Sequence, residues 1–272
     1  AYGKAGGFEL AYGSDLDLVF LCPSYIQGDT DGGAIINNNV FYVRFGQRVI
    51  HILTSFTRFG ILYSADLRLR PQGSKGPLVA TIGAFERYQE SEAWTWEHQA
   101  LIRARFVAGD VALGEAFKTV RRNLIARERD LDQLQQDVCS MRQRMRDNLA
   151  IPAAGQPESA SEILGKFDLK HDTGAIVDIE FMVQYVVLAR ASRHGGLCRW
   201  TDVMRLLDEL ESAGVMPESE VEALQRAYLA FRAAVHYGWL GLDTDFERLQ
   251  SYRHEVRRIW LARMEAGDHK NI

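Results

Sequence analysis

Cysteine is scarce in this chain, with three residues among 272, at Cys22, Cys139 and Cys198. They form no C-x-x-C pair and their number is odd, so the sequence indicates neither a disulfide framework nor a zinc site. A reducing cytoplasm is the simplest location for such a protein. The seven histidines are dispersed, and none pairs with another at the spacing of metal ligands.

The chain also has no excess of basic residues over acidic ones. The formal net charge is -4 at pH 7, whereas domains that bind nucleic acids in general are usually basic. No apolar run approaches the ~20 residues of a membrane-spanning helix. No signal peptide is visible, although the first residues resemble the interior of a motif, which predicts a further segment upstream. We therefore expect a cytoplasmic protein that binds neither nucleic acid nor membrane.

The composition that is present is that of an ordinary globular protein. Hydrophobic residues make up 47% of the chain and charged residues 25%, which are typical fractions for soluble domains. A length of 272 residues allows one large domain or two ordinary ones. No internal repeat of fixed period is found.

Residues 13–21 (Gly-Ser-Asp-Leu-Asp-Leu-Val-Phe-Leu) combine two carboxylates with an apolar run. In a strand, residues two apart point to the same face, so Asp15 and Asp17 would lie side by side. Two like charges held so close cost free energy unless a cation neutralises them. Mg²⁺ prefers carboxylate and phosphate oxygens, so these residues indicate a metal site. The alternative is a turn aspartate followed by a solvent-facing aspartate on an edge strand.

Two further features flank this strand. Residues 1–14 are rich in glycine, and the backbone N–H groups of such a turn can bind phosphate. A second strand is predicted over residues 61–71, where Asp66, Arg68 and Arg70 alternate with apolar residues. An amphipathic edge strand with a solvated charged face is the alternative for this segment.

A glycine turn, a strand with two acids and a second strand with a third acid are what two-metal nucleotidyl transfer needs. Two Mg²⁺ ions bridge the attacking oxygen, the α-phosphorus and the leaving pyrophosphate, and three carboxylates on adjacent strands can hold them. Basic residues nearby offset the phosphate charge.

The rest of the chain is predicted to be mainly helical. A helix over about 40–57 carries an apolar stripe with a residue at every fourth position. Further helices are expected in the segment from 82, over 110–149, from 175, and over 201–213, 218–237 and 245–265. We predict an α+β fold, with a nucleotidyltransferase α/β core over 1–110, a further strand at about 163–171, and a helical domain over 111–272.

Several motifs together resemble a known family. The Gly3-Lys4 turn followed by D-x-D resembles the DNA polymerase β-like nucleotidyltransferase superfamily. Closer similarity lies in residues 2–10 (Tyr-Gly-Lys-Ala-Gly-Gly-Phe-Glu-Leu), 13–20, 67–71 and 174–181 (Gly-Ala-Ile-Val-Asp-Ile-Glu-Phe), which look like glutamine synthetase adenylyltransferase. Residues 92–101 (Glu-Ala-Trp-Thr-Trp-Glu-His-Gln-Ala-Leu) resemble the C-terminal, adenylylating half of that bifunctional family. Lys4 and Ala175 depart from the small residue and the glycine that the family usually has there.

The resemblance implies roles for particular residues. Three of them would be catalytic and would bind Mg²⁺ or Mn²⁺: Asp15, Asp17 and Asp66. Five would lie near the nucleotide: Gly3, Ser14, Arg68, Arg70 and Lys170. Asp178 and Glu180, in a motif shared with the related uridylyltransferase, would line or brace the pocket. A helix-capping or salt-bridging role is the alternative for Glu180.

The resemblance also implies a reaction. AMP would pass from ATP to a tyrosine hydroxyl of glutamine synthetase, pyrophosphate would leave, and the synthetase activity would fall. Asp66 would act as the general base, and PII signalling protein and glutamine would be effectors. One alternative is the reverse reaction, the phosphorolytic removal of AMP from adenylylated synthetase. Another is an inactive helical module that docks glutamine synthetase or PII.

Overall fold

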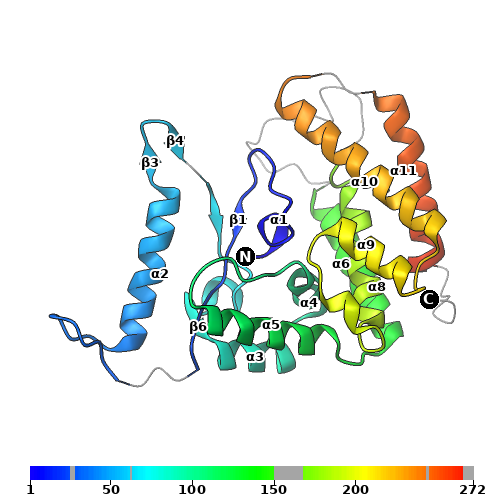
Figure 1. Cartoon of the computed structure of the whole chain (residues 1–272). Helices are drawn as coiled ribbons and strands as arrows, with labels where there is room; N and C mark the ends of the chain where they lie inside the picture. Colours follow the sequence, from blue (N-terminus) through cyan, green and yellow to red (C-terminus); the bar gives the residue numbers. More distant parts are fainter. Residues whose placement is uncertain (25–27, 62, 150–167, 243–244, 266–272) are drawn as a thin grey trace. The chain divides into compact units, whose positions relative to one another are not determined.

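The computed structural model describes residues 1–272 except 25–27, 62, 150–167, 243–244 and 266–272. The chain forms two compact units, Ala1–Ile125 and Ala126–Ile272, which we call unit 1 and unit 2. The predicted α+β fold is confirmed, because short strands occur in unit 1 and helices make up most of the described chain (Figure 1). No helix among the described residues is both long enough and apolar enough to span a bilayer.

Unit 1 combines short strands with helices. Its elements in chain order are α1 (Gly3–Gly6), β1 (Leu16–Asp17), β2 (Phe20–Cys22), α2 (Asn38–Thr54), β3 (Phe56–Thr57), β4 (Gly60–Ile61), β5 (Ala65–Asp66), the 3₁₀-helix η1 (Gly73–Lys75), β6 (Val79–Thr81), α3 (Ile82–Ser91), α4 (Thr95–Ile102) and α5 (Val111–Ile125). β1 pairs in parallel with β5 and β2 with β6, whereas β3 and β4 form an antiparallel hairpin. Parallel pairing needs a long crossover connection, and α2 lies in that connection.

The core of unit 1 is built by α3, α4 and α5. α5 packs against both α3 and α4, and the Thr81 hydroxyl caps α3 by accepting a hydrogen bond from the Ala84 N–H. The buried core residues are Tyr2, Ile82, Phe85, Leu101, Ala104, Phe117, Val120 and Leu124. Val19 and Leu21 pack against this cluster, so the core holds the segment that follows the acidic strand.

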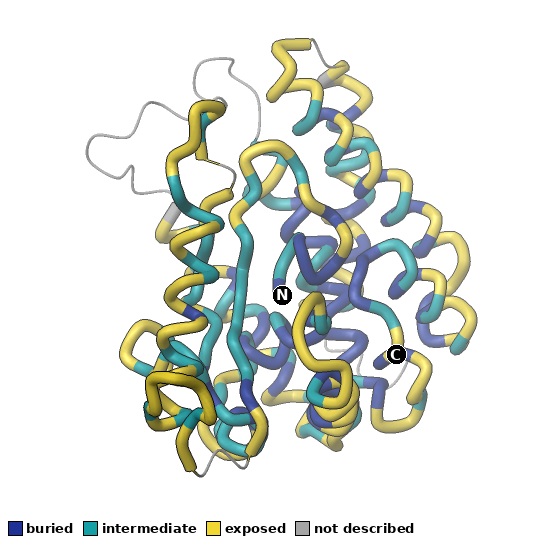
Figure 2. Tube along the Cα trace, turned by 60° about the vertical axis from the view of Figure 1, so that its left-hand side comes forward, coloured by how far each residue is buried: buried dark blue, intermediate teal, exposed yellow. Residues whose placement is uncertain are grey.

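α2 is covered far less than the other helices of unit 1, and Gly46 is its only residue classed as buried. A Cβ atom at Gly46 would lie 3.2 Å from Val79 Cγ2, so the glycine lets α2 approach β6 closely. The predicted apolar stripe of this helix is largely exposed, with Phe41 and Phe45 at 42% and 59% exposure. Figure 2 shows exposed and intermediate residues along most of α2.

Unit 2 is helical in its described residues. Its elements are α6 (Leu131–Leu149), α8 (Ile176–Arg190), the 3₁₀-helix η2 (Gly195–Cys198), α9 (Val203–Ser212), α10 (Glu218–Trp239), α11 (Phe246–Trp260) and a π-helical turn η3 (Leu261–Glu265). α8 packs against α6, α9, α10 and α11. Most of its residues are buried, as expected of a helix that is apolar nearly all round and lies in the middle of a bundle.

The single helix predicted over 110–149 is two helices, α5 and α6, separated by residues 126–130. The Asp130 carboxylate accepts a hydrogen bond from the Gln133 N–H, which starts a new helix at that point. Because α5 packs on α3 and α4, the first compact unit extends to Ile125, whereas the sequence placed the domain change near residue 110.

The strand predicted over about 163–171 is wrong for its described part. Residues 169–171 form a turn, and residues 163–167 lie outside the described residues. The Asp168 carboxylate accepts hydrogen bonds from the backbone N–H groups of Lys170 and His171, at 2.7 and 3.1 Å. Such a local side-chain acceptor favours a turn over an extended strand. The strand predicted over 61–71 is likewise shorter, because β5 ends at Asp66 and Arg68 lies in a turn.

Candidate active site

Parallel pairing of β1 with β5 brings two acidic residues that are distant in sequence together. Asp17 lies opposite Asp66 in the register of the two strands, and Asp15 comes directly before β1. Asp15, Asp66, Arg68 and Arg70 line a shallow cavity of about 410 Å³. Four of the residues predicted from the sequence therefore lie at one site, with Asp17 beside them on β1.

Asp17 is a half-buried carboxylate with like charges beside it. Burial raises the pKa of Asp17 above its usual value, and the charges of Asp66 and Asp15 raise it further. Arg68 and Arg103 lower it, but less. The balance of these effects disfavours the charged form of Asp17.

Asp66 is neutralised by Arg68. The Arg68 backbone N–H donates to Asp66 Oδ1 at 2.8 Å, and Arg68 Nε donates to Oδ2 at 2.8 Å. Arg68 Nη2 also pairs with Oδ2. These hydrogen bonds hold the pKa of Asp66 below its usual value. The Arg68 side chain is 81% exposed, so it can leave the carboxylate without disturbing any packing.

Glycine is required at position 3 by the position of Asp17. Gly3 has φ +53°, and a Cβ atom there would lie 2.2 Å from Asp17 Oδ2. The Tyr2 N–H donates to the Asp17 carbonyl at 2.8 Å. The predicted glycine turn is the short helix α1, which lies directly against the D-x-D strand. Any other residue at position 3 would displace the carboxylate.

Two arginines whose roles no sequence motif indicates, Arg103 and Arg105, hold the glycine-rich segment in place. Arg105 Nε and Nη2 donate to the carbonyls of Gly6 and Ala5, both at 3.0 Å. Arg103 is buried and forms an ion pair with Glu9. Both arginines follow α4 and are about a hundred residues from their partners in sequence. Only their occurrence in an otherwise apolar stretch could have indicated a structural role.

The two remaining predicted nucleotide residues of unit 1 have their polar atoms engaged locally. Ser14 Oγ accepts a hydrogen bond from the Ala11 N–H at 3.0 Å. The Arg70 guanidinium donates to the carbonyls of Leu67, Gly76 and Ser74, at 2.8, 3.2 and 3.1 Å. Arg70 thus supports the loop after β5, whereas Arg68 is the arginine whose charge faces the acidic cluster.

The donor chemistry of this site fits a hard divalent cation, because carboxylate oxygens are what Mg²⁺ and Mn²⁺ prefer. A cation would also offset the burial and the carboxylate repulsion that together raise the pKa of Asp17. Among the described residues, however, no three acidic, histidine or cysteine side chains converge closely enough to hold an ion as they stand. Asp66 would first have to be released by Arg68.

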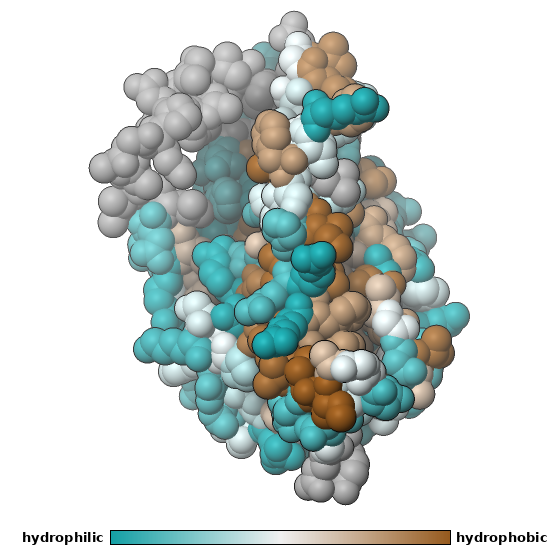
Figure 3. All heavy atoms as spheres, turned by 90° about the vertical axis from the view of Figure 1, so that its left-hand side faces the viewer, coloured by the Kyte–Doolittle hydropathy of each residue, from teal (hydrophilic) through white to brown (hydrophobic). Residues whose placement is uncertain are grey.

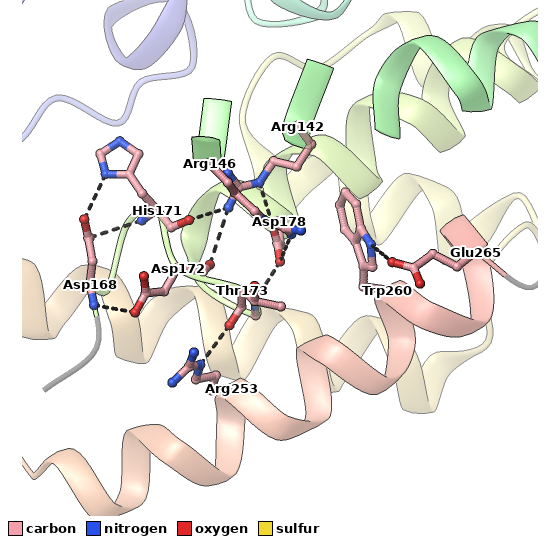
Figure 4. Close-up of polar contacts among 11 residues, drawn as sticks. Arg142, Arg146, Asp168, His171, Asp172, Thr173, Asp178, Arg253, Trp260 and Glu265 are labelled. Carbon is pink, nitrogen blue, oxygen red and sulfur yellow. Dashed lines mark hydrogen bonds and ion pairs between the residues drawn. The ribbon is translucent and has the colours of Figure 1, made fainter. Parts of the chain in front are cut away.

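The motif 174–181 is built around a buried ion-pair cluster in unit 2. Asp178 is fully buried, and its Oδ1 accepts hydrogen bonds from Arg142 Nε at 2.6 Å and from Arg146 Nη2 at 2.9 Å (Figure 4). Asp178 Oδ2 accepts a hydrogen bond from the Gly174 N–H at 2.7 Å. This carboxylate joins α6 to the start of α8, which gives it a structural role.

The other predicted residues of unit 2 lie around the same helix. Glu180 Oε1 accepts a hydrogen bond from the Tyr228 hydroxyl at 3.2 Å, which joins α8 to α10. Lys170 is exposed on the turn before α8. Burial raises the pKa of the Asp168 carboxyl in this turn, but hydrogen bonds from His171 and Lys170 outweigh it and hold the pKa at about 2.

Comparison with known proteins identifies the family. Residues 1–120 match the model of glutamate-ammonia ligase adenylyltransferase, and residues 139–238 match that of the GlnD PII-uridylyltransferase. Proteins named bifunctional glutamine synthetase adenylyltransferase/adenylyl-removing enzyme align with nearly the whole chain. The protein from Pseudomonas aeruginosa is 51% identical over 95% of this chain, and that from Methylococcus capsulatus is 48% identical over 98%. The chain belongs to the glutamine synthetase adenylyltransferase family.

The membership that the sequence motifs predicted is thereby confirmed. The chain spans 27% of the length of these relatives, and the relative from Thioalkalivibrio sulfidiphilus, 45% identical, gives the same share. The names of the relatives combine two activities, the attachment and the removal of an adenylyl group. Which of them this member of the adenylyltransferase family performs is a separate question.

Proposed function

We propose that this chain transfers AMP from ATP to a tyrosine hydroxyl of glutamine synthetase, with release of pyrophosphate. The observation that carries the proposal is the acidic cluster, in which Asp17 lies opposite Asp66 and directly against the Gly3 turn. Nucleotidyl transfer needs such a cluster beside a backbone that a phosphate group can approach. The adenylylating direction is supported by residues 92–101, which resemble the adenylylating half of the family.

Residues 92–101 also support the site structurally. Glu97 accepts a hydrogen bond from the Trp94 N–H at 2.9 Å and caps α4. The Tyr88 hydroxyl donates to the same carboxylate at 3.0 Å. α4 leads directly into the segment with Arg103 and Arg105, whose contacts hold the glycine turn.

Each acidic residue has a part in the proposed reaction. Mg²⁺ or Mn²⁺, held by Asp15, Asp17 and Asp66, would neutralise the triphosphate and polarise its α-phosphorus. A tyrosine hydroxyl with a pKa of ~10 needs a base or a metal to attack at neutral pH. Asp66 was predicted as that base, but its pairing with Arg68 lowers its pKa and makes it a weaker one. Release of Arg68 would restore both the basicity of Asp66 and its freedom to bind metal.

The test is to mix the chain with unmodified glutamine synthetase, ATP labelled at the α-phosphate and Mg²⁺. We expect label on the synthetase and release of pyrophosphate. A second incubation, with adenylylated synthetase and phosphate, examines the reverse reaction. Release of ADP there, without labelling in the first incubation, would contradict the proposed direction. Absence of both reactions and of Mg²⁺–ATP binding in calorimetry would favour the inactive docking module.

The sequence also predicts effectors and a location for this activity. We propose glutamine and a PII signalling protein as its effectors and the cytoplasm as its location. Addition of each effector to the labelling reaction tests the first part: a rate that neither effector changes would contradict it for this chain.

A further inference from the structure

A surface of unit 1 projects apolar side chains into solvent next to the acidic cluster. α2 and the β3–β4 hairpin, which we call the arm (Asn38–Ile61), form one continuous piece of chain. Phe56 and Phe59 at its tip are 82% and 84% exposed, and Ile52 and Ile61 are 65% and 58% exposed. Figure 3 views the side of the molecule that carries α2 and shows hydrophobic side chains exposed among hydrophilic ones. Clusters of exposed large apolar side chains mark interaction sites.

The tip of the arm is ordered by its own contacts. The Thr57 hydroxyl donates to the Gly60 carbonyl at 2.8 Å and accepts a hydrogen bond from the Phe59 N–H at 3.2 Å. Gly60 has φ +99°, which suits glycine in a tight turn. The Arg58 guanidinium lies 4.6 Å from the centre of the Phe59 ring. The turn and the Phe59 ring are therefore held in position before any partner arrives, which lowers the entropic cost of binding.

The charged residues of the arm are all basic. No aspartate or glutamate lies between Asp31 and Asp66, whereas Arg44, Arg48 and Arg58 fall in this interval. This basic segment stands out in a chain whose net charge is -4. Aromatic side chains and arginine are also the residues enriched at protein interfaces. A partner that fits this surface offers apolar side chains together with carboxylates.

The arm is directly connected to the candidate active site. Its last residue, Ile61, precedes Asp66 by five positions, and α2 packs against β5, which carries Asp66. A protein bound to the arm would therefore lie beside the acidic cluster. Proximity of this kind is what an enzyme with a protein substrate needs, because it holds the acceptor hydroxyl near the reacting phosphate.

We propose that the arm is the docking surface for the acceptor protein, through a segment of that protein that presents apolar and acidic side chains next to the acceptor hydroxyl. This inference rests on the proposed function, because that function supplies the acceptor, glutamine synthetase. The arm aligns the acceptor with the cluster at Asp17 and Asp66, and its tip residues Phe56, Arg58 and Phe59 do not line the cavity at that cluster.

The test measures binding of the full chain to unmodified glutamine synthetase, separately from AMP transfer. The variants are the tip double variant Phe56→Ser/Phe59→Ser and the charge variant Arg58→Glu. The matched controls are Trp239→Ser, at an aromatic residue of unit 2 that is 63% exposed, and Arg258→Glu, at an exposed arginine of α11. We expect both arm variants to bind at least ~10-fold more weakly, because aromatic and arginine side chains dominate binding energy. The controls should bind like the wild type, and the melting temperature should not change.

The outcomes separate this inference from the proposed function. Weaker binding by the arm variants supports the arm as a docking surface, even if the wild type transfers no AMP, in which case only the proposed function fails. Wild-type affinity in both arm variants, or no binding by the wild type, would overturn the inference. A marked fall of the melting temperature in the arm variants would show that the tip packs within the protein's own fold, and would overturn it as well. In an active preparation, the KM for the synthetase should rise while the KM for ATP stays constant.

Discussion

Asp17 in unit 1 and Asp178 in unit 2 are the same residue type in opposite electrostatic surroundings. Asp178 is fully buried and receives hydrogen bonds from Arg142, Arg146 and the Gly174 N–H. Asp17 is half-buried, and Asp66 and Asp15 are among its nearest charges. A carboxylate whose charge is fully compensated stabilises the fold. One whose charge is not compensated stores free energy that a ligand can release.

This difference changes how the two sequence motifs are interpreted. The D-x-D motif and the motif at 174–181 both looked functional, because each carries acids at regular spacing. The structure gives Asp178 and Glu180 contacts that join α8 to α6 and α10. Among the described residues, Arg68 and Arg103 lower the pKa of Asp17, but less than burial and the carboxylates of Asp66 and Asp15 raise it. This difference favours the D-x-D motif over residues 174–181 as the proposed ligand site.

The largest expected effect concerns Asp178→Asn. The change removes the charge that compensates Arg142 and Arg146, and breaking a buried ion pair typically costs ~3–5 kcal/mol. Urea denaturation measures this loss in the free energy of unfolding. The matched control is Glu222→Gln, which breaks an exposed pair with Arg226 and should cost less than about 1 kcal/mol. A loss for Asp178→Asn as small as that of the control would contradict the assigned role of the cluster.

The second prediction is a fall in the rate of AMP transfer in Gly3→Ala, which corresponds to a smaller free energy than the loss in Asp178→Asn. The new Cβ atom would displace the Asp17 carboxylate, which lies 2.2 Å from its position. Misplacement of a reacting group by about 1 Å can lower the rate ~10²-fold. The matched control is Gly214→Ala, because Gly214 has φ +69° and open space around it. Both variants share the cost of an alanine at positive φ, and Gly3→Ala should lose somewhat more stability in urea because of its added clash. At matched folded fractions, only Gly3→Ala should lose AMP transfer. Equal AMP transfer by Gly3→Ala and Gly214→Ala would contradict a functional role for the close approach of Gly3 to Asp17.

Some features of the site could be predicted from the sequence and others could not, and the difference lies in whether the partners are local. The strand at Asp17 and the special backbone conformation of Gly3 could be predicted because strand and glycine preferences are local. The break at Asp130 could have been found from the same kind of signal, an acid followed by glutamine three residues later. The positions of Arg103 and Arg105 could not, because their partners are about a hundred residues away and only tertiary packing brings them together.

The smallest expected effect is a gain of stability in Asp17→Asn. The folded-state pKa of Asp17 is raised, so its charge costs stability once the pH exceeds the unfolded-state value. The cost is full above the folded-state pKa and vanishes as the pH falls below the unfolded one. Denaturation from pH 7 down to pH 4 should show Asp17→Asn more stable at pH 7, with a shrinking difference. Asp66→Asn is the control with the opposite sign, because the pKa of Asp66 is lowered by Arg68. A stability change of the same sign in both variants would contradict the opposite pKa shifts of Asp17 and Asp66.

In the proposed reaction, AMP transfer depends on the charge of the Asp17 carboxylate. The most direct measurement compares wild type and Asp17→Asn in transfer of labelled AMP to glutamine synthetase, at saturating Mg²⁺–ATP and on preparations with matched folded fractions. The substitution removes a charge and keeps the side-chain shape. Loss of one electrostatic stabiliser typically lowers the rate ~10²–10³-fold, and we expect a loss at least that large. Transfer by Asp17→Asn at nearly the wild-type rate would contradict the claim.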